Sequence, residues 1–243
     1  MKNLLAIILI LAISACASVK SNKINKKKYP SWLIQPQNTI TGLSAKYYYE
    51  DKSIDVALQN AINKYGKLQY CLVKGGQTFI QTPAGMSIVD DSLYVHIFEN
   101  DKFTDKFFYE YTPVDTFTST GFVAVCFADK NSSNGQKSDL VYLDDECEWA
   151  KEPPLDDEFI YAIGYCDILG DELRSWQYAE NHAILSLAKQ KSMDKFGEEL
   201  EADGTRMSMS IENINIELHD IEIVERWKDE KYNIYYVLIR MKK

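Results

Sequence analysis

The sequence has few of the residues, and none of the short motifs, that usually indicate enzyme chemistry. Its 243 residues include three histidines (His96, His182 and His219), and none pairs with another histidine, a cysteine or an acidic residue at the spacing of a zinc or iron site. It has no Gly-x-Ser-x-Gly elbow, no phosphate-binding Walker loop and no dinucleotide-binding glycine pattern. We therefore predict no catalytic residue, no bound metal and no cofactor, and hence a protein that is not an enzyme.

Two weaker patterns are better explained by ordinary structure. Ser186 and Lys189 match the Ser-x-x-Lys start of penicillin-binding nucleophiles, but the companion elements are missing and Ser186 lies in the middle of an expected helix. The acidic groups at 144–146 and 156–158 fit no calcium-binding loop. We interpret the first as a chance match and the second as solvated surface.

Long apolar runs are also missing, with one exception at the start. The run from Leu4 to Ile13 has about half of the roughly 20 residues that a membrane-spanning helix needs. It follows the charged start Met1-Lys2-Asn3 and leads into Ile13-Ser14-Ala15-Cys16, which is the layout of a secretory signal.

The aliphatic, small, small, cysteine order resembles the signal of bacterial lipoproteins. The resemblance implies that the Cys16 thiol receives a diacylglyceryl group, that residues 1–15 are removed and that the new amino terminus is acylated. The alternative is an ordinary signal cut after Ala15, with an incidental cysteine. Ala17 and Ser18 follow, without the aspartate that retains many such lipoproteins in the inner membrane, so the resemblance favours the outer membrane.

The charge of the chain is divided unevenly. Residues 16–28 contain five lysines and no acid, and we expect this tether to be disordered, either solvated or lying on anionic lipid. Residues 29–243 carry 21 basic and 36 acidic side chains, a net charge of −15. A body this acidic repels phosphate backbones, so we predict no nucleic-acid binding.

Four cysteines remain after Cys16. Export would place them in an oxidising compartment, where Cys71, Cys126, Cys147 and Cys166 could form disulfides in three pairings. Their wide spacing matches no metal site, and Cys126 and Cys166 lie in apolar runs typical of buried small hydrophobic residues. The sequence leaves open whether any disulfide forms.

The pattern of apolar residues predicts a first α+β unit over residues 29–128. A short strand over 39–43 precedes a helix over about 52–70, in which apolar residues recur every three or four positions. Lys74-Gly75-Gly76 is expected to be a turn, and further strands are expected over 92–98, 106–111 and 121–127.

Residues 153–243 predict a second unit of similar order, after a linker over 129–152. A strand over 159–164 precedes a helix over about 171–197 with Gly197 as its C-cap. Alternating residues follow from Met207, with a bulge or bend near Asn213, and then strands over 221–227 and 234–239. We therefore predict an α+β fold made of two tandem copies, each a helix packed on a mostly antiparallel sheet. Eight helix residues should be buried alike: Leu58, Ala61, Ile62 and Tyr65 in the first copy, and Ala179, Ala183, Leu187 and Ala188 in the second.

Both halves resemble one bacterial family, the 20-kilodalton membrane-associated lipoproteins, which include flagellar outer-membrane lipoproteins. The family pattern is a proline near a tryptophan, a strand with a glycine, and a helix with spaced alanines. The matching positions are Pro30, Trp32, Gly42, Ala57 and Ala61 in the first half, and Pro154, Gly164, Ala179, Ala183 and Ala188 in the second. The resemblance supplies no catalytic residue.

These observations predict a membrane-anchored lipoprotein of the cell envelope. Its role would be structural, or the assembly or binding of partners, with the membrane contacted through N-terminal acyl chains and with copies of itself or other envelope proteins as partners. The alternative is a binding module for a cell-wall or surface glycan. That alternative depends on the sixteen tyrosines, including the runs at 47–49 and 235–236, because tyrosine suits half-wet contacts.

Overall fold

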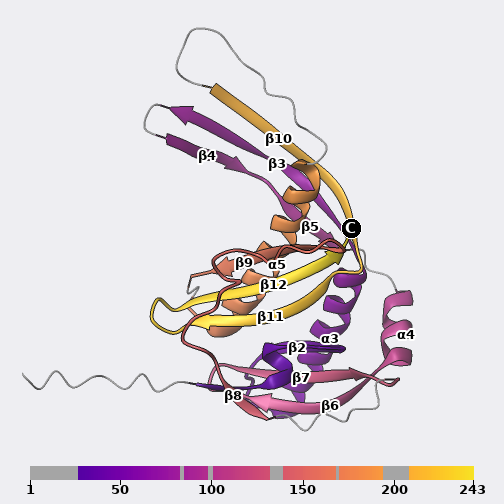
Figure 1. Cartoon of the computed structure of the whole chain (residues 1–243). Coiled ribbons are helices and arrows are strands. Elements are labelled where there is room, and N and C mark those ends of the chain that lie inside the picture. Colours follow the sequence, from indigo (N-terminus) through magenta and orange to yellow (C-terminus); the bar gives the residue numbers. More distant parts are fainter. Residues whose placement is uncertain (1–26, 83–84, 98–100, 132–138, 168–169, 194–207) are drawn as a thin grey trace, which may run out of the picture.

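A computed structural model describes residues 27–82, 85–97, 101–131, 139–167, 170–193 and 208–243. The fold is α+β, with helices packed on antiparallel sheets, as predicted (Figure 1). Its elements in chain order are β1 (Lys28–Pro30), α2 (Ser31–Ile34), β2 (Thr39–Ala45), α3 (Glu50–Gln69), β3 (Tyr70–Thr82), β4 (Gly85–Asp91), β5 (Tyr94–Ile97), α4 (Asp101–Glu110), β6 (Tyr111–Thr118), β7 (Phe122–Asp129), β8 (Leu140–Tyr142), β9 (Phe159–Cys166), α5 (Glu172–Met193), β10 (Ser208–His219), β11 (Glu222–Asp229) and β12 (Ile234–Lys242).

The first sheet has the antiparallel order β2-β7-β6, and α3 packs across it. The approach is close because Gly42 has no side chain: a Cβ atom there would lie 1.9 Å from the carbonyl oxygen of Ala57. The periodic apolar residues of the sequence do form this helix, and it begins at Glu50, two residues earlier than predicted.

The second sheet has the matching order β9-β12-β11, with α5 packed on it. A Cβ atom on Gly164 would lie 2.0 Å from the carbonyl oxygen of Ala179 and 2.2 Å from the amide nitrogen of Ala183. Helix α5 is described to Met193, so the predicted cap at Gly197 lies outside the described residues.

The two sheets share details beyond strand order. In the first, Gly42 pairs with Val125 of the central strand, and in the second Gly164 pairs with Val237. The strand farthest from the glycine is irregular in both sheets, between Pro113 and Asp115 in β6 and near Ile223 in β11. These similarities are what a repeated β-strand–helix unit would produce.

A third sheet joins the halves through β3 and β10, which pair without interruption from Tyr70↔His219 to Gln81↔Ser208. In Figure 1, β3, β4 and β10 extend together away from the other sheets. Two predictions from the sequence concern this sheet. Lys74-Gly75-Gly76 is not a turn but part of β3, where Gly75 takes a φ of 122° that favours glycine. Of the bulge or bend expected near Asn213, the continuous β10 register excludes the bulge, and the residue with unusual backbone is Gly75, opposite Ile214.

The strand predicted over 106–111 is wrong as well. Residues 101–110 form α4, and β6 begins only at Tyr111. Phe103 and Phe107 are one helical turn apart, and both rings contact Tyr65 of α3. Apolar residues this closely spaced fit either period, and contact with α3 favours the helix.

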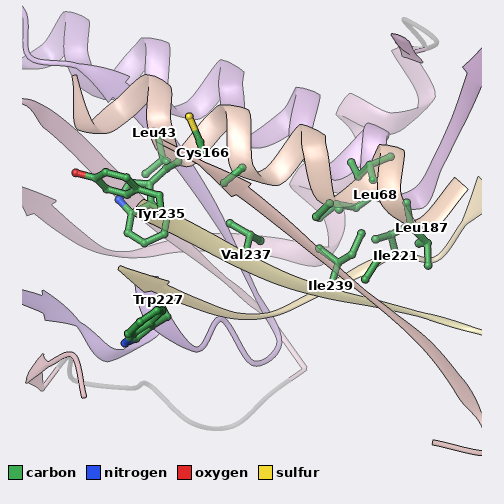
Figure 2. Packing of buried hydrophobic residues seen from close by; sticks show 14 of the residues in the cluster. Leu43, Leu68, Cys166, Leu187, Ile221, Trp227, Tyr235, Val237 and Ile239 are labelled. Carbon is green, nitrogen blue, oxygen red and sulfur yellow. The ribbon is translucent and has the colours of Figure 1, made fainter. Parts of the chain in front are cut away.

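The buried side chains form two clusters. The smaller one lies between α3, α4 and β7, whereas the larger one combines α5 and β12 with residues of the first half. Figure 2 shows Leu43 and Leu68 of the first half in the same cluster as Leu187 and Val237. The core therefore runs across both halves. Seven of the eight helix residues predicted to be buried are so, and Leu58 is only partly buried.

Parts of the predicted tether and of the predicted linker belong to the folded body. Lys28 belongs to β1, which pairs with β8 inside the predicted linker, so the expected disorder of the tether is wrong for Lys27 and Lys28. Within the same linker, Leu143 and Cys147 are buried, and the Asp144 carbonyl accepts a 2.9 Å hydrogen bond from Trp227 Nε1.

All four described cysteines are buried and free, so the burial expected for Cys126 and Cys166 is confirmed. Burial raises the pKa of the Cys71 thiol to about 11 and that of Cys126 to about 12. These thiols are therefore held in their protonated, poorly nucleophilic form.

Candidate functional site

A buried ion cluster lies where the two halves meet. Glu180 of α5 accepts hydrogen bonds through one oxygen, Oε1, from Lys64 Nζ of α3 at 2.8 Å and from Arg226 Nη2 of β11 at 2.9 Å. Arg226 Nη1 also donates to the Leu33 carbonyl at 2.6 Å. All three charged side chains are buried, and Arg226 is 0% exposed. Four separate elements are thus joined at one point.

The cluster carries more positive than negative charge. Burial would raise the pKa of Glu180, but the attraction of Lys64, Arg226 and Lys67 lowers it to about 2. Burial, together with repulsion from Arg226 and Lys67, lowers the pKa of Lys64 to about 8 despite the attraction of Glu180. Both shifts have the sign expected where cations outnumber anions.

Such a cluster is not the most stable way to pack a helix interface. Removing ions from water costs several kcal/mol each, and replacing a buried pair with apolar residues of similar volume is often neutral or stabilising. Removing only one partner, by contrast, leaves an uncompensated buried charge. The cluster therefore fixes how the halves are arranged, and its charged groups are also candidates for binding a ligand.

Two cavities lie on either side of Lys64. The larger, which we call the junction cavity, has a volume of about 520 Å³ and is bounded by the start of β2, the end of α3 and the start of β11. Its charged lining residues are Lys64, Arg226, Arg240, Asp220 and Glu222. Because Arg240 pairs with Glu222 and Arg226 with Glu180, the charges around it are nearly balanced.

The smaller cavity, which we call the interhelical cavity, has a volume of about 200 Å³ and lies between α3 and α5. Apart from Leu43 its lining is polar, and it consists of Asn60, Asn63, Lys64, Lys67, Gln177, Glu180 and Asn181. The positions on α3 are three or four residues apart, and so are those on α5, so each helix turns one polar face toward the other.

The N-terminal segment of the described chain binds to both halves. Lys27 Nζ donates to Ser119 Oγ in the first half and forms an ion pair with Glu172 at the start of α5. Tyr29 donates to the same carboxylate at 2.5 Å, and Trp32 Nε1 donates to Asp115 Oδ2 at 2.8 Å. These contacts hold Lys27, Tyr29 and Trp32 in place against the folded body.

Aromatic side chains of α5 and of the second sheet form a row. Tyr165 and Tyr178 are exposed, and their ring centroids lie 5.0 and 6.4 Å from that of His182. Tyr236 and then Trp227 continue the row from Tyr165 at 6.2 and 5.4 Å. Of the tyrosine runs noted in the sequence, Tyr47–Tyr49 is exposed, whereas Tyr235 is buried.

The other residues singled out from the sequence lie apart. Cys16 is outside the described residues. His182 Nδ1 accepts a 3.3 Å hydrogen bond from the Tyr165 amide, and the His219 ring packs against Tyr70 in a tilted arrangement. Ser186 and Lys189 lie in the continuous helix α5. Across the described ranges, no group of three or more His, Cys, Asp or Glu side chains is placed to hold a metal ion.

Sequence reasoning missed the ion cluster. A signal was present, because Lys64 interrupts the apolar face of α3 between Ala61 and Leu68, and Glu180 follows Ala179 on the packing side of α5. A charge among helix-spaced alanines indicates a paired, buried group, but its partner Arg226 cannot be identified from local pattern.

Comparisons with protein-family models, with curated proteins and with solved structures found no match to this chain. Among the described helices, none has both the length and the apolar character needed to cross a bilayer.

Proposed function

We propose that this protein is a lipid-anchored lipoprotein of the bacterial cell envelope, outer membrane favoured, whose folded body binds partners and catalyses no reaction. The observation that carries the proposal is Ile13-Ser14-Ala15-Cys16 at the end of a short apolar run. Acyl chains on Cys16 would insert in the membrane, because several chains together give stable anchoring.

The place where the fold begins supports this arrangement. Ten residues separate Cys16 from Lys27, the first residue that the structure describes, which contacts both halves of the body. A tether of this length spans at most roughly 35 Å when fully extended. The body would then stay close to the membrane surface, with its N-terminal segment as the fixed attachment point.

We also propose that the halves are tandem copies of one α+β unit. The supporting observations are the equal strand orders, the two glycines under the helices, and a constant interval of 122 residues. That interval relates Gly42 to Gly164, Ala57 to Ala179 and Ala61 to Ala183. Copies of one unit can pair with each other, so this proposal is compatible with self-assembly or with related envelope proteins as partners.

Replacing Cys16 tests the anchor. In cells that express the full chain, Cys16→Ala should move the protein from the detergent phase to the aqueous phase. Wild-type protein should incorporate an alkyne-labelled fatty acid, and mass spectrometry should find the acylated N-terminus at residue 16. Cys71→Ala, which alters a buried thiol, is the matched control and should stay in the detergent phase. An unmodified N-terminus at Cys16 contradicts the proposal.

A second candidate is glycan binding, which the aromatic row from Tyr178 to Trp227 favours. Tyrosine rings stack on the apolar faces of sugars, and two of these rings are exposed. Co-sedimentation with purified peptidoglycan separates the candidates. Sedimentation that is lost in Tyr165→Ala favours the glycan, whereas protein that stays in solution and forms oligomers in light scattering favours protein partners.

A further inference from the structure

The interhelical cavity differs from an ordinary contact between two helices. Helices usually meet through apolar side chains, because burying apolar surface is the main favourable term in packing. Here α3 and α5 instead present lysine, amide and carboxylate groups to an open space of about 200 Å³. Polar groups that line a cavity have hydrogen-bonding capacity available to a ligand.

Several of these groups are held in place by the protein. Asn60 Nδ2 donates to the Leu43 carbonyl at 2.7 Å, and Lys67 Nζ donates to Asn181 Oδ1 at 2.8 Å. Lys64 is held by Glu180 at 2.8 Å. An ammonium group has three donor hydrogens, and each of these lysine bonds uses one. The lysines are therefore oriented and retain donors for a ligand.

The charge around the cavity selects the kind of ligand. The charged residues that line the cavity are Lys64, Lys67 and Glu180, which together carry a net charge of about +1, and Arg226 lies next to the same carboxylate. An anion placed between Lys64 and Lys67 would reduce this excess, whereas a cation would increase it. The lining of the junction cavity has a similar net charge, but both of its arginines already pair with carboxylates.

We propose that the interhelical cavity is a binding site for a small anion that bears a carboxylate or phosphate group, with Lys64 and Lys67 as its cationic ligands. The amide side chains of Asn63, Gln177 and Asn181 complete the site as donors at its open side. The volume is small and restricts the ligand to the size of a single compact anion. The inference does not depend on the lipid anchor.

Titration of the purified full-length chain, in detergent, with inorganic phosphate and separately with acetate tests the site. Heat of binding and chemical shifts of the α3 amides are the readouts, and sodium chloride at equal ionic strength is the reference. At least one of the two anions should bind with a Kd of about 1 mM or below. Saturation by phosphate alone identifies the ligand class as phosphate, and saturation by acetate alone identifies it as carboxylate.

Variants separate the site from general charge effects. Lys67→Gln, at the half-buried rim, should weaken binding about tenfold, because it removes one charge-assisted hydrogen bond. The matched control is Lys189→Gln, 122 residues later on α5 and not among the residues that line either cavity. Lys64→Met should abolish binding, and if this buried variant does not fold, Lys67→Gln still decides.

The pH dependence provides an independent readout. Affinity should fall as the pH rises through about 8, where Lys64 loses its charge while Lys67 on α3, Glu180 on α5 and Arg226 on β11 face it. Burial lowers the pKa of Lys67 as well, so both cationic ligands lose charge in the same direction of pH. The proposal is overturned if neither anion binds beyond the effect of chloride. It is also overturned if Lys67→Gln and Lys189→Gln weaken binding equally.

Discussion

Helices α3 and α5 lie on their sheets in the same way but end in different surroundings. Each crosses a three-stranded antiparallel sheet over a glycine, with alanines at the contact. Most of the buried face of α3 belongs to a small cluster with β7 and α4, and only its last turn, at Leu68, reaches the large cluster. Helix α5 belongs to the large cluster, which includes Leu43, Phe122 and Cys126 of the first sheet. The second helix is thus part of a core shared by both halves.

The two helices also differ in the side chain that each uses to bind the edge strand of its sheet. Asn60 donates to the carbonyl of Leu43, and 122 residues later His182 accepts from the amide of Tyr165. Both partners lie on strands at the edge of a sheet, where backbone groups lack a neighbouring strand. In both halves this helix position therefore supplies a hydrogen-bond partner to the edge strand. The residue is a donor, asparagine, where the strand presents a carbonyl, and an acceptor, histidine, where the strand presents an amide.

Loss of the Glu180 carboxylate, which links α5 to α3 through Lys64, should reduce the free energy of unfolding the most. Glu180→Gln leaves Lys64 and Arg226 buried without a carboxylate, which should lower the free energy of unfolding by about 3–5 kcal/mol at pH 7 in urea titrations. The folded pKa of Glu180 is about 2, below its ordinary value of 4.5. The advantage of wild type over the variant should therefore be complete above about pH 4.5 and disappear as the pH falls toward 2.

The control for this variant is Glu222→Gln, whose carboxylate is exposed and pairs with Arg240 at 2.6 Å. Exposed ion pairs contribute about 1 kcal/mol or less. Equal losses in the two variants would mean that the buried cluster does not join the halves.

The glycines test whether the two helix contacts are equally tight. Gly164→Ala should lower the free energy of unfolding by about 3 kcal/mol, because its new methyl group would meet backbone atoms of both Ala179 and Ala183. Gly42→Ala should cost somewhat less, since its third neighbour is the Ala61 side chain at 3.0 Å. Gly121→Ala meets no atom within 4 Å and should be nearly neutral. A larger loss for Gly42→Ala would reverse the comparison.

The edge-strand contacts should give the smallest effects. Asn60→Ala and His182→Ala each remove one hydrogen bond to a backbone group, with an expected loss of about 1 kcal/mol. Amide hydrogen exchange sharpens the comparison. His182→Ala should speed exchange at the Tyr165 amide itself, whereas Asn60→Ala should leave the Leu43 amide unchanged, because Asn60 binds the carbonyl. Equal acceleration at both amides would contradict the assignment.

The fold class and helices α3 and α5 could be predicted from the sequence because they depend on local periodicity, whereas the position of Gly42 and Gly164 beneath the helices is known only from the structure. Apolar residues at steps of three and four in α3, and the alternation of Ile214, Ile216 and Leu218 in β10, survive in the structure. Residues 106–111 did not follow this rule, because Phe107 packs on Tyr65 of a distant helix and that contact decides between helix and strand.

The candidate site depends on contacts that local pattern does not contain. Lys64, Glu180 and Arg226 come from three elements separated by more than forty residues at each step. The pairing of β3 with β10 is similarly distant, and for that reason Lys74–Gly76 was predicted to be a turn. The identity of Cys16 as an anchor stays a prediction.

The bond from Arg226 to the Leu33 carbonyl, 193 residues apart, has a consequence for how the chain folds. The N-terminal segment is synthesised first, but the Leu33 carbonyl can accept its hydrogen bond from Arg226 only after β11 has been synthesised. Contacts between such distant residues slow folding, because a long loop closes before they form. The segment nearest the proposed tether should therefore be the last to form all of its contacts. In a chain truncated before β11, the Leu33 carbonyl should lack its hydrogen bond from Arg226.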